Sequence, residues 1–294
     1  MDRVTGSMTS RTVLADVERV YGRLAASQEE LSSGKRIEKP SDDPFGTSRA
    51  LLYRSALAAN DQFQANAGEA GAWLETTDAA LSSLSDDLRR VRELVVQGAN
   101  GSLSQTDRDA IAAELDQLAE SVKSAANARY AGSYVLAGTK TDTAPFAVGG
   151  SDAYAGDGGA IAREIGDGVT LTVNVTGDTV VSPILAAIRQ AATDLRTGGT
   201  PGNLGTVDLR AIDAAADTLA ETQATVGARE ARVASATARL QQLREAQARQ
   251  LSETEDADVA QAMVEFSQQS AVYQAALRAG ASLIQPTLMD FLSP

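Results

Sequence analysis

The chain of 294 residues contains neither cysteine nor histidine, only 4% of its residues are aromatic, and its formal net charge is −13. Without cysteine it cannot form disulfides or thiolate metal sites. A strongly acidic chain also lacks the positive face that nucleic-acid phosphates require, so nucleic-acid binding is not expected. Much of the apolar content is alanine, and the larger apolar residues fall in narrow stripes, which favours long helices packed side by side.

Residues 1–10 contain no apolar segment of the kind that a cleavable signal peptide needs. No run approaches the ~18 consecutive apolar residues of a membrane span, so membrane insertion is not expected either. These features indicate a cytosolic protein, or one exported by a machinery that recognises another kind of signal.

The first predicted helix covers residues 11–31 and follows a short polar segment that is expected to fray. Its apolar residues recur every seven positions in two rows, the pattern of a helix that buries a narrow stripe against another helix. The rows consist of Val13 and Val20, and of Val17, Leu24 and Leu31. Gly34 is expected to end this helix in the left-handed conformation.

A rigid elbow is predicted next. Pro40 and Pro44 stand four residues apart and prevent a continuous helix. Asp42 or Asp43 can cap the following helix, with Pro44 in its first turn. The basic residues beside the acidic pair could form a ligand site, but a solvated charge cluster on a turn is the simpler interpretation. The elbow motif comprises Gly34, Lys35, Arg36, Pro40, Asp42, Asp43 and Pro44.

Two middle helices are expected at residues 45–97 and 107–128, the second opened by a cap at Ser104 and Asp107. The first carries the clearest heptad rows of the chain, formed by Leu74, Leu81, Leu88 and Val95, and by Thr77, Leu84 and Val91. The second carries an apolar stripe of Ile111, Leu115, Leu118 and Val122.

Composition changes after Tyr130, because the following segment is rich in Gly, Thr, Asp and Val and alternates between residues 169 and 175. We therefore expect a small β-rich insert at 138–182. Helix resumes at Ser182 and Pro183, and after a loop at 197–205 one last middle helix extends to about residue 251. Its apolar positions recur at sevens as Ile212, Leu219, Val226, Val233 and Leu240.

The C-terminal stretch predicts another helix with a heptad seam. Ser252 and Glu255 have the spacing of a capping box at its start, and Asp256 and Asp258 suit the helix dipole. One row consists of Val259, Phe266 and Tyr273, and the companion row, broken at Ser270, of Met263, Leu277, Ile284 and Phe291. Both chain ends thus carry seams of one period, which predicts that they pair with each other or with another molecule.

The predicted shape is a rod. A helix from Leu209 to Leu251 would be ~65 Å long, whereas a compact globule of this chain length would be only ~50 Å across. The expected domains are a terminal coiled-coil assembly domain at 1–44 and 252–294, a helical rod domain at 45–137 and 183–251, and the outer insert. An alternative, two amphipathic helices packed on a globular core, lacks an evident core.

Enzyme activity and cofactors are not expected. Without histidine or cysteine there is no imidazole base and no thiol nucleophile, although a carboxylate pair or a serine with a lysine remains formally available. The glycine-rich segment 156–159 lacks the spacing of a dinucleotide loop, so turn chemistry explains it better.

Several motifs, taken in chain order, resemble the flagellin superfamily. Residues 31–37, followed by Ser41 to Pro44, are similar to its signature, and Glu255 to Ala260 resemble the start of its terminal helix. Other features are similar to one family within it, the hook-associated protein 3 family, whose members are the junction proteins between hook and filament. These features are the opening at Arg3 to Met8, the prolines of the elbow, the segment 130–139 followed by Pro145 and Phe146, and the ending 283–292.

This resemblance implies a structural protein of the bacterial flagellum, extracellular at the hook–filament junction and exported through the flagellar type III channel without a cleavable signal peptide. It implies terminal segments that order on assembly into an axial ring, neighbouring hook-associated protein and flagellin subunits as partners, and a flagellar export chaperone. The terminal seams are then expected to carry subunit packing. Two alternatives stay open, a filament flagellin and a cytoplasmic coiled-coil signalling or cytoskeletal protein.

Overall fold

The computed structural model describes residues 6–197 and 203–284. It divides the chain into two compact units, an end unit of residues 1–58 with 245–294 and a middle unit of residues 59–244. These units differ from the three predicted domains, whose boundaries stay predictions. The predicted fold class, mainly helical with a small β insert, is confirmed. Within residues 6–197 and 203–284, no helix has both the length and the apolar character that crossing a membrane requires.

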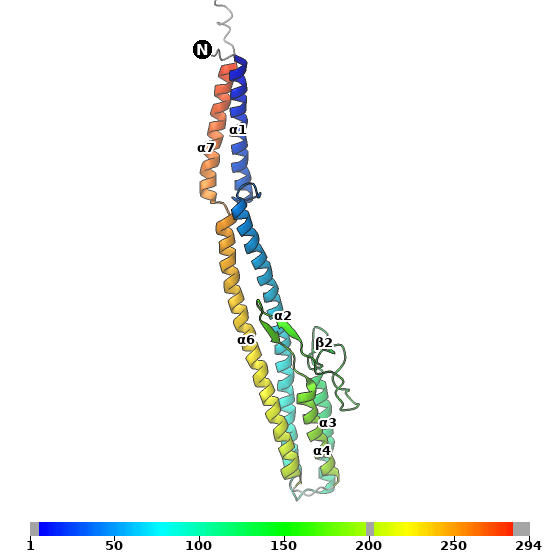
Figure 1. Cartoon of the computed structure of the whole chain (residues 1–294). Helices are drawn as coiled ribbons and strands as arrows, with labels where there is room; N and C mark the ends of the chain where they lie inside the picture. Colours follow the sequence, from blue (N-terminus) through cyan, green and yellow to red (C-terminus); the bar gives the residue numbers. More distant parts are fainter. Residues whose placement is uncertain (1–5, 198–202, 285–294) are drawn as a thin grey trace, which may run out of the picture. The chain divides into compact units, whose positions relative to one another are not determined.

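Two antiparallel helices dominate the end unit, α1 (Gly6–Ser33) and α7 (Val259–Ile284), which lie side by side (Figure 1). Tyr21 and Tyr273 meet across the pair with ring centroids 5.7 Å apart. A Cβ on Gly280 would lie 3.1 Å from the Val13 side chain, so the helices approach closely there. The helix that was predicted to begin near residue 11 begins at Gly6, and residues 1–5 lie outside the described part.

The predicted cap at Ser252 is wrong. Helix α6 (Leu209–Glu255) continues through that residue, with the Thr254 hydroxyl donating to the Gln250 carbonyl. Helix α7 starts only at Val259, after a break at 256–258. The Asp258 carboxylate caps it by accepting from the backbone N–H groups of Ala260 and Gln261 in its first turn. A capping box needs a chain that arrives in a non-helical conformation, and residues 252–255 are already helical.

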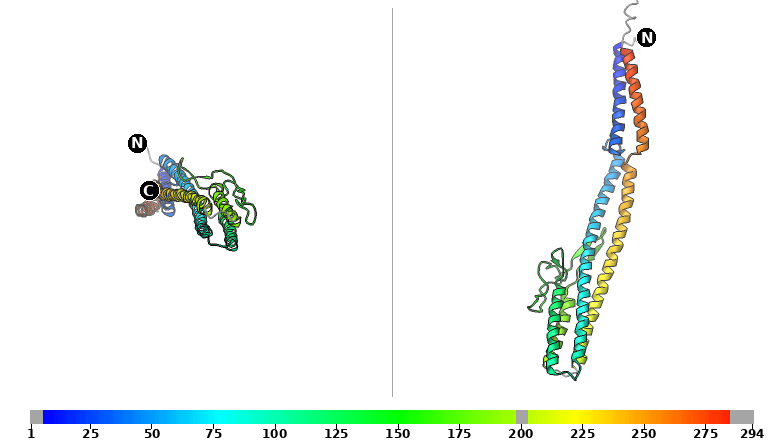
Figure 2. Two further views of the ribbon diagram at one scale, coloured as in Figure 1. Left: turned by 90° about the horizontal axis from the view of Figure 1, so that it is seen from below. Right: turned by 180° about the vertical axis from the view of Figure 1, so that it is seen from behind.

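Within the middle unit, α2 (Pro44–Gly98) and α6 pack antiparallel and lie side by side, as the view from behind in Figure 2 also shows. The Asn60 side chain donates to the Leu240 carbonyl at one end of this contact, and Arg92 pairs with Asp213 at the other. The predicted seam residues of both helices are buried, which confirms their heptad rows: Leu74, Thr77, Leu81, Leu84, Leu88, Val91 and Val95 on α2, and Ile212, Leu219, Val226, Val233 and Leu240 on α6.

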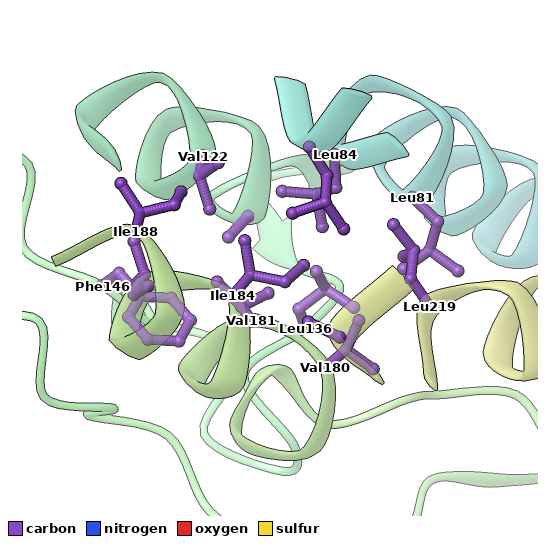
Figure 3. Close-up of a cluster of buried hydrophobic side chains, with 14 of the residues drawn as sticks. Leu81, Leu84, Val122, Leu136, Phe146, Val180, Val181, Ile184, Ile188 and Leu219 are labelled. Atoms are coloured by element: carbon purple, nitrogen blue, oxygen red, sulfur yellow. The ribbon is translucent and has the colours of Figure 1, made fainter. Parts of the chain in front are cut away.

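Two shorter helices, α3 (Gln105–Ala126) and α4 (Gly177–Arg196), complete the core. Figure 3 shows Leu84 of α2, Val122 of α3, Ile184 of α4 and Leu219 of α6 converging on one apolar cluster. The cap predicted at the start of α3 is confirmed, because the Ser104 hydroxyl and the Asp107 carboxylate form a complete capping box. The apolar stripe of α3 faces this cluster, with Leu118 partly buried.

The insert contains less regular structure than the alternating sequence indicated. Within it, β3 (Ala162–Glu164) and β4 (Thr170–Thr172) form an antiparallel pair in which Arg163 lies opposite Leu171. A second antiparallel pair, β1 (Arg129–Tyr130) and β2 (Ser133–Tyr134), precedes the insert. Turns and side-chain hydrogen bonds organise the remainder. The Asp157 carboxylate, for example, accepts from the Thr139 backbone and hydroxyl, each at 2.6 Å.

The start of α4 was also predicted too late. The helix begins at Gly177, where a Cβ would lie 3.1 Å from the Phe146 ring and 3.2 Å from the Leu136 carbonyl oxygen. Pro183 therefore lies inside α4 rather than in its first turn, and the helix forgoes one main-chain hydrogen bond there. A π-helical turn, η1 (Leu204–Asp208), leads into α6.

Candidate assembly surface

One face of α1 packs on α7 (Figure 1). The five predicted seam residues are half-buried on this face, and Ser27 is buried between Leu24 and Leu31. The spacing alternates between four and three residues, as in a heptad seam. The structure therefore brings together Val13, Val17, Val20, Leu24 and Leu31 on the side of α1 that meets α7.

The matching face of α7 is built largely from small residues. Phe266 and Tyr273 are half-buried on it, but the most buried positions are Ala262 and Gly280. Sequence reasoning missed these two because it followed only large apolar side chains. Their spacing, with Phe266, Gln269, Tyr273 and Ala276 between them, also alternates between four and three, and that periodicity was a usable signal.

The other predicted row of α7 stays largely exposed. Met263 is 58% exposed and Leu277 is 45% exposed, and Val259, at the start of the helix, is 51% exposed. These three residues share one flank of the helix, beside the face that contacts α1. Ile284 is the last residue of α7, and its side chain lies outside the described part, as does Phe291 at the end of the predicted row.

Exposed apolar side chains are common in the end unit, whereas buried ones are few. Among its described residues, Ile37, Ala50 and Ala262 are the buried apolar ones. The exposed large apolar residues are Leu14 and Tyr21 on α1, Phe45, Leu51 and Leu52 on α2, and Val259, Met263, Val264, Val272 and Leu277 on α7. Apolar exposure on this scale marks an interaction surface, because water contact with it is unfavourable.

The elbow motif packs on the break between α6 and α7. Gly34 has a φ of +69°, as its predicted C-cap role requires, and its carbonyl accepts from the Ala257 backbone at 3.0 Å. The Glu255 carbonyl accepts from the backbone N–H groups of Arg36 at 2.8 Å and of Ile37 at 3.3 Å. Main-chain bonds thus join two interruptions that lie far apart in sequence.

Glu255 is the main charged group at this junction. Its side chain is 4% exposed, and its carboxylate oxygens lie 2.5 Å from Lys35 Nζ and 2.5 Å from Arg54 Nη2. Burial by itself raises the pKa of Glu255, but hydrogen bonds from Lys35 and Arg54 outweigh it and hold that pKa below its usual value. Sequence reasoning assigned Glu255 to a helix cap and did not foresee this role.

The acidic pair of the elbow shapes its two ends. Asp43 Oδ1 accepts from the Gly46 backbone at 2.9 Å and caps α2, and Pro44 lies in the first turn of that helix as predicted. Asp42 Oδ2 accepts from the Lys39 backbone at 2.9 Å and closes the turn that begins at Pro40. Arg36 Nη1 lies 3.7 Å from Asp43. The cluster is satisfied by its own bonds, which favours the structural interpretation over a ligand site.

Comparison with known families identifies the origin of this arrangement. The bacterial flagellin N-terminal helical region matches residues 7–141, and the bacterial flagellin C-terminal helical region matches residues 209–292. The chain belongs to the flagellin superfamily. The two matched regions contain α1, the elbow, α2 and α3 on one side, and α6 with α7 on the other.

Among curated relatives, this flagellin-superfamily protein is 31% identical to flagellar hook-associated protein 3 of Escherichia coli strain K12. The aligned region of 157 residues covers 53% of this chain and 49% of the relative. It is 37% identical over 130 residues to the flagellin of Salmonella muenchen, covering 44% of this chain and 25% of that flagellin. The chain spans about half the length of the hook-associated relatives that it matches.

Solved structures share the fold. The structure of FlgL from Bacillus cereus superposes with a TM-score of 0.60 at 22% identity, over 68% of this chain and 99% of that one. The flagellar junction protein FlgL from Legionella pneumophila superposes with a TM-score of 0.59 at 17% identity, over 70% of this chain and 99% of that one.

Proposed function

We propose that this protein is a structural component of the bacterial flagellum, a junction protein that links hook to filament by axial self-assembly through its paired terminal helices. The observation that most supports this proposal is the exposed flank of α7. One face of α7 already packs on α1, yet Val259, Met263 and Leu277 stand exposed at heptad spacing beside it. A second apolar flank on a paired helix fits packing against further helices from neighbouring copies.

The end unit alone supports this proposal energetically. Ordering the backbone costs about 1–2 kcal/mol per residue, and the α1–α7 contact leaves its seam side chains only half-buried and relies on Ala262 and Gly280. Neighbouring copies that cover the exposed flank would supply the missing burial. The elbow would hold α1 and α7 in register, because its bonds to residues 255–257 anchor the base of both helices.

The proposed partners follow from the relatives. They are further copies of this chain in an axial ring, a neighbouring hook-associated protein and flagellin subunits, with a flagellar export chaperone before assembly. The proposed site is extracellular, at the hook–filament junction, after export through the flagellar type III channel. Curated relatives named flagellar hook-associated protein 3 favour this placement. A structural role leaves no task for a catalytic site.

The test changes one exposed residue of the flank. Met263→Asp should block filament attachment, while circular dichroism should show helices as stable as in the unchanged chain, because Met263 is 58% exposed. Gln268→Asp is the matched control, since Gln268 is exposed about 180° around α7 from Val259. Normal filaments on cells that carry only Met263→Asp would contradict the proposal.

A second candidate is a filament flagellin, which the 37% identity to the flagellin of Salmonella muenchen favours. Labelling the protein on cells separates the two. A junction protein is found at the filament base, whereas a flagellin is found along the whole filament.

A cytoplasmic coiled-coil signalling or cytoskeletal protein would keep both end helices protected in a dilute monomer. Limited proteolysis of the purified chain tests this, because an assembly protein should lose both ends before its middle unit is cut.

A further inference from the structure

Two arginines of α6 stand beside the β3–β4 hairpin without an internal partner. Within the described residues, neither Arg232 nor Arg239 bonds to a carboxylate or a carbonyl oxygen. Neighbouring arginines are engaged, since Arg229 donates to the Asn174 carbonyl and Arg244 pairs with Asp61. Two uncompensated cations that line one groove produce a local positive potential, which favours an anionic partner.

The two arginines line a groove. Its walls are α6, with Ser235 between the arginines, and the hairpin, with Ile165 and Val169. Seven residues separate Arg232 from Arg239, which places them about 10 Å apart along one side of the helix. The Arg239 guanidinium lies over the hairpin turn, because a Cβ on Gly166 would come within 3.1 Å of it. The groove thus offers two cationic heads and a hydroxyl above an apolar floor.

Uncompensated carboxylates occur on the opposite side of the same helix pair. Burial, and then the negative charges of Asp78 and Glu75 on α2, raise the pKa of Glu230 on α6. None of these three acids pairs with a cation in the part of the chain that the structure describes. Glu230 precedes Arg232 and Arg239 by two and nine residues, which places it about 200° and about 180° from them around the helix.

We propose that the arginine groove of one copy receives the acidic ridge of a neighbouring copy, formed by Glu75, Asp78 and Glu230. This inference rests on the proposed self-assembly and specifies a second contact for it, in the middle unit. A positive surface on one side and a negative one on the other make a heterologous interface, which repeats in one direction around a ring or along a helix. Pairing removes both the unpaired cations and the crowded carboxylates.

Charge reversal of the full-length chain tests this contact. Arg232→Glu with Arg239→Glu should weaken self-association about tenfold in sedimentation velocity across a concentration series, and so should Asp78→Arg with Glu230→Arg. The chain that carries all four changes should regain self-association, because its groove and ridge are again of opposite sign. Arg249→Glu, at an exposed arginine of α6 outside the groove, is the control and should change little.

The outcomes separate this inference from the proposed function. Loss with either pair and recovery with all four changes supports the contact, and loss without recovery overturns the acidic ridge as its partner. Unchanged self-association in both double variants, with loss in Met263→Asp, overturns the groove contact alone. Self-association that Met263→Asp also leaves unchanged overturns the proposed function. Melting curves of every variant establish that the helices stay folded.

Discussion

Glu255 and Lys35 lie 220 positions apart in the chain, and Glu255 Oε1 lies 2.5 Å from Lys35 Nζ. Through this ion pair the end of α6 is tied to the elbow that follows α1. Arg54 of α2 completes the contact from the other side of the carboxylate. A single buried acid thus joins the N-terminal and C-terminal segments at the place where both interrupt their helices.

Replacing that acid should loosen the end unit. Glu255→Gln removes both ion pairs, and we expect the free energy of unfolding to fall by about 1–2 kcal/mol. This is less than for a fully buried pair, because Lys35 and Arg54 are 44% and 49% exposed and can be hydrated. Faster hydrogen exchange at the Arg36 and Ile37 amides would report it. Glu253→Gln, at an exposed position, serves as the control. Equal exchange in both variants would argue against the role of Glu255.

Acid should destabilise the middle unit through the ion network around Lys123. A hydrogen bond from Arg189 most strongly holds the pKa of Asp152 below its usual 3.8, and Lys123 does the same for the pKa of Glu120 relative to 4.5. A lowered folded pKa contributes stability that is complete above the unfolded value and is lost as the pH falls through the folded one. The melting temperature should therefore fall steeply below about pH 4.

The variant Asp152→Asn provides the check on this pH dependence. It should flatten the fall below pH 4 while leaving the exposed pair Arg89–Asp86 unaffected. A fall of unchanged steepness would place the acid sensitivity elsewhere in the chain.

Asp208 should show the opposite behaviour. Its side chain is 1% exposed, and both carboxylate oxygens lack a hydrogen-bond donor among the described residues. Burial, and then the charge of Asp194, raise the pKa of Asp208 to about 6, so the ionised form is penalised in the folded state above that pH. Asp208→Asn should stabilise the chain by about 1–3 kcal/mol at pH 7, and the gain should shrink toward pH 4.

Denaturant titrations at pH 7 and pH 4 measure the Asp208 effect. Asp213→Asn, which removes the partner of Arg92 on the exposed side of α6, is the comparison and should not stabilise. A stabilisation by Asp208→Asn that is the same at both pH values would contradict the burial account.

Two helical glycines should respond differently to alanine. A Cβ on Gly227 in α6 would meet nothing within 4 Å, so Gly227→Ala should gain up to about 1 kcal/mol from helix propensity. Gly280→Ala gains the same propensity but meets Val13 at 3.1 Å, which offsets it. Gly280→Leu should separate α7 from α1 and expose both helices to protease. Protease resistance equal to that of the unchanged chain would show that the approach at Gly280 is not required.

The heptad seams of the helices and the elbow could be predicted from the amino-acid sequence. Heptad rows such as Leu74 to Val95 are local, periodic signals, and Gly34 and Asp43 act on backbone groups a few residues away. The motifs around the elbow and the C-terminal helix also sufficed to indicate the family. Such features could be predicted because each depends on neighbours in sequence.

The partners of those elements depend on how the chain packs. Ser252 and Glu255 have the spacing of a cap, yet Glu255 bonds to Lys35 and Arg54, and that competing partnership depends on residues far away in the chain. The face of α7 that meets α1 contains Ala262 and Gly280, because the two helices approach each other closely. Met263 and Leu277 therefore stay exposed beside that face. Charge pairing and burial at these places depend on residues that lie far apart in the chain.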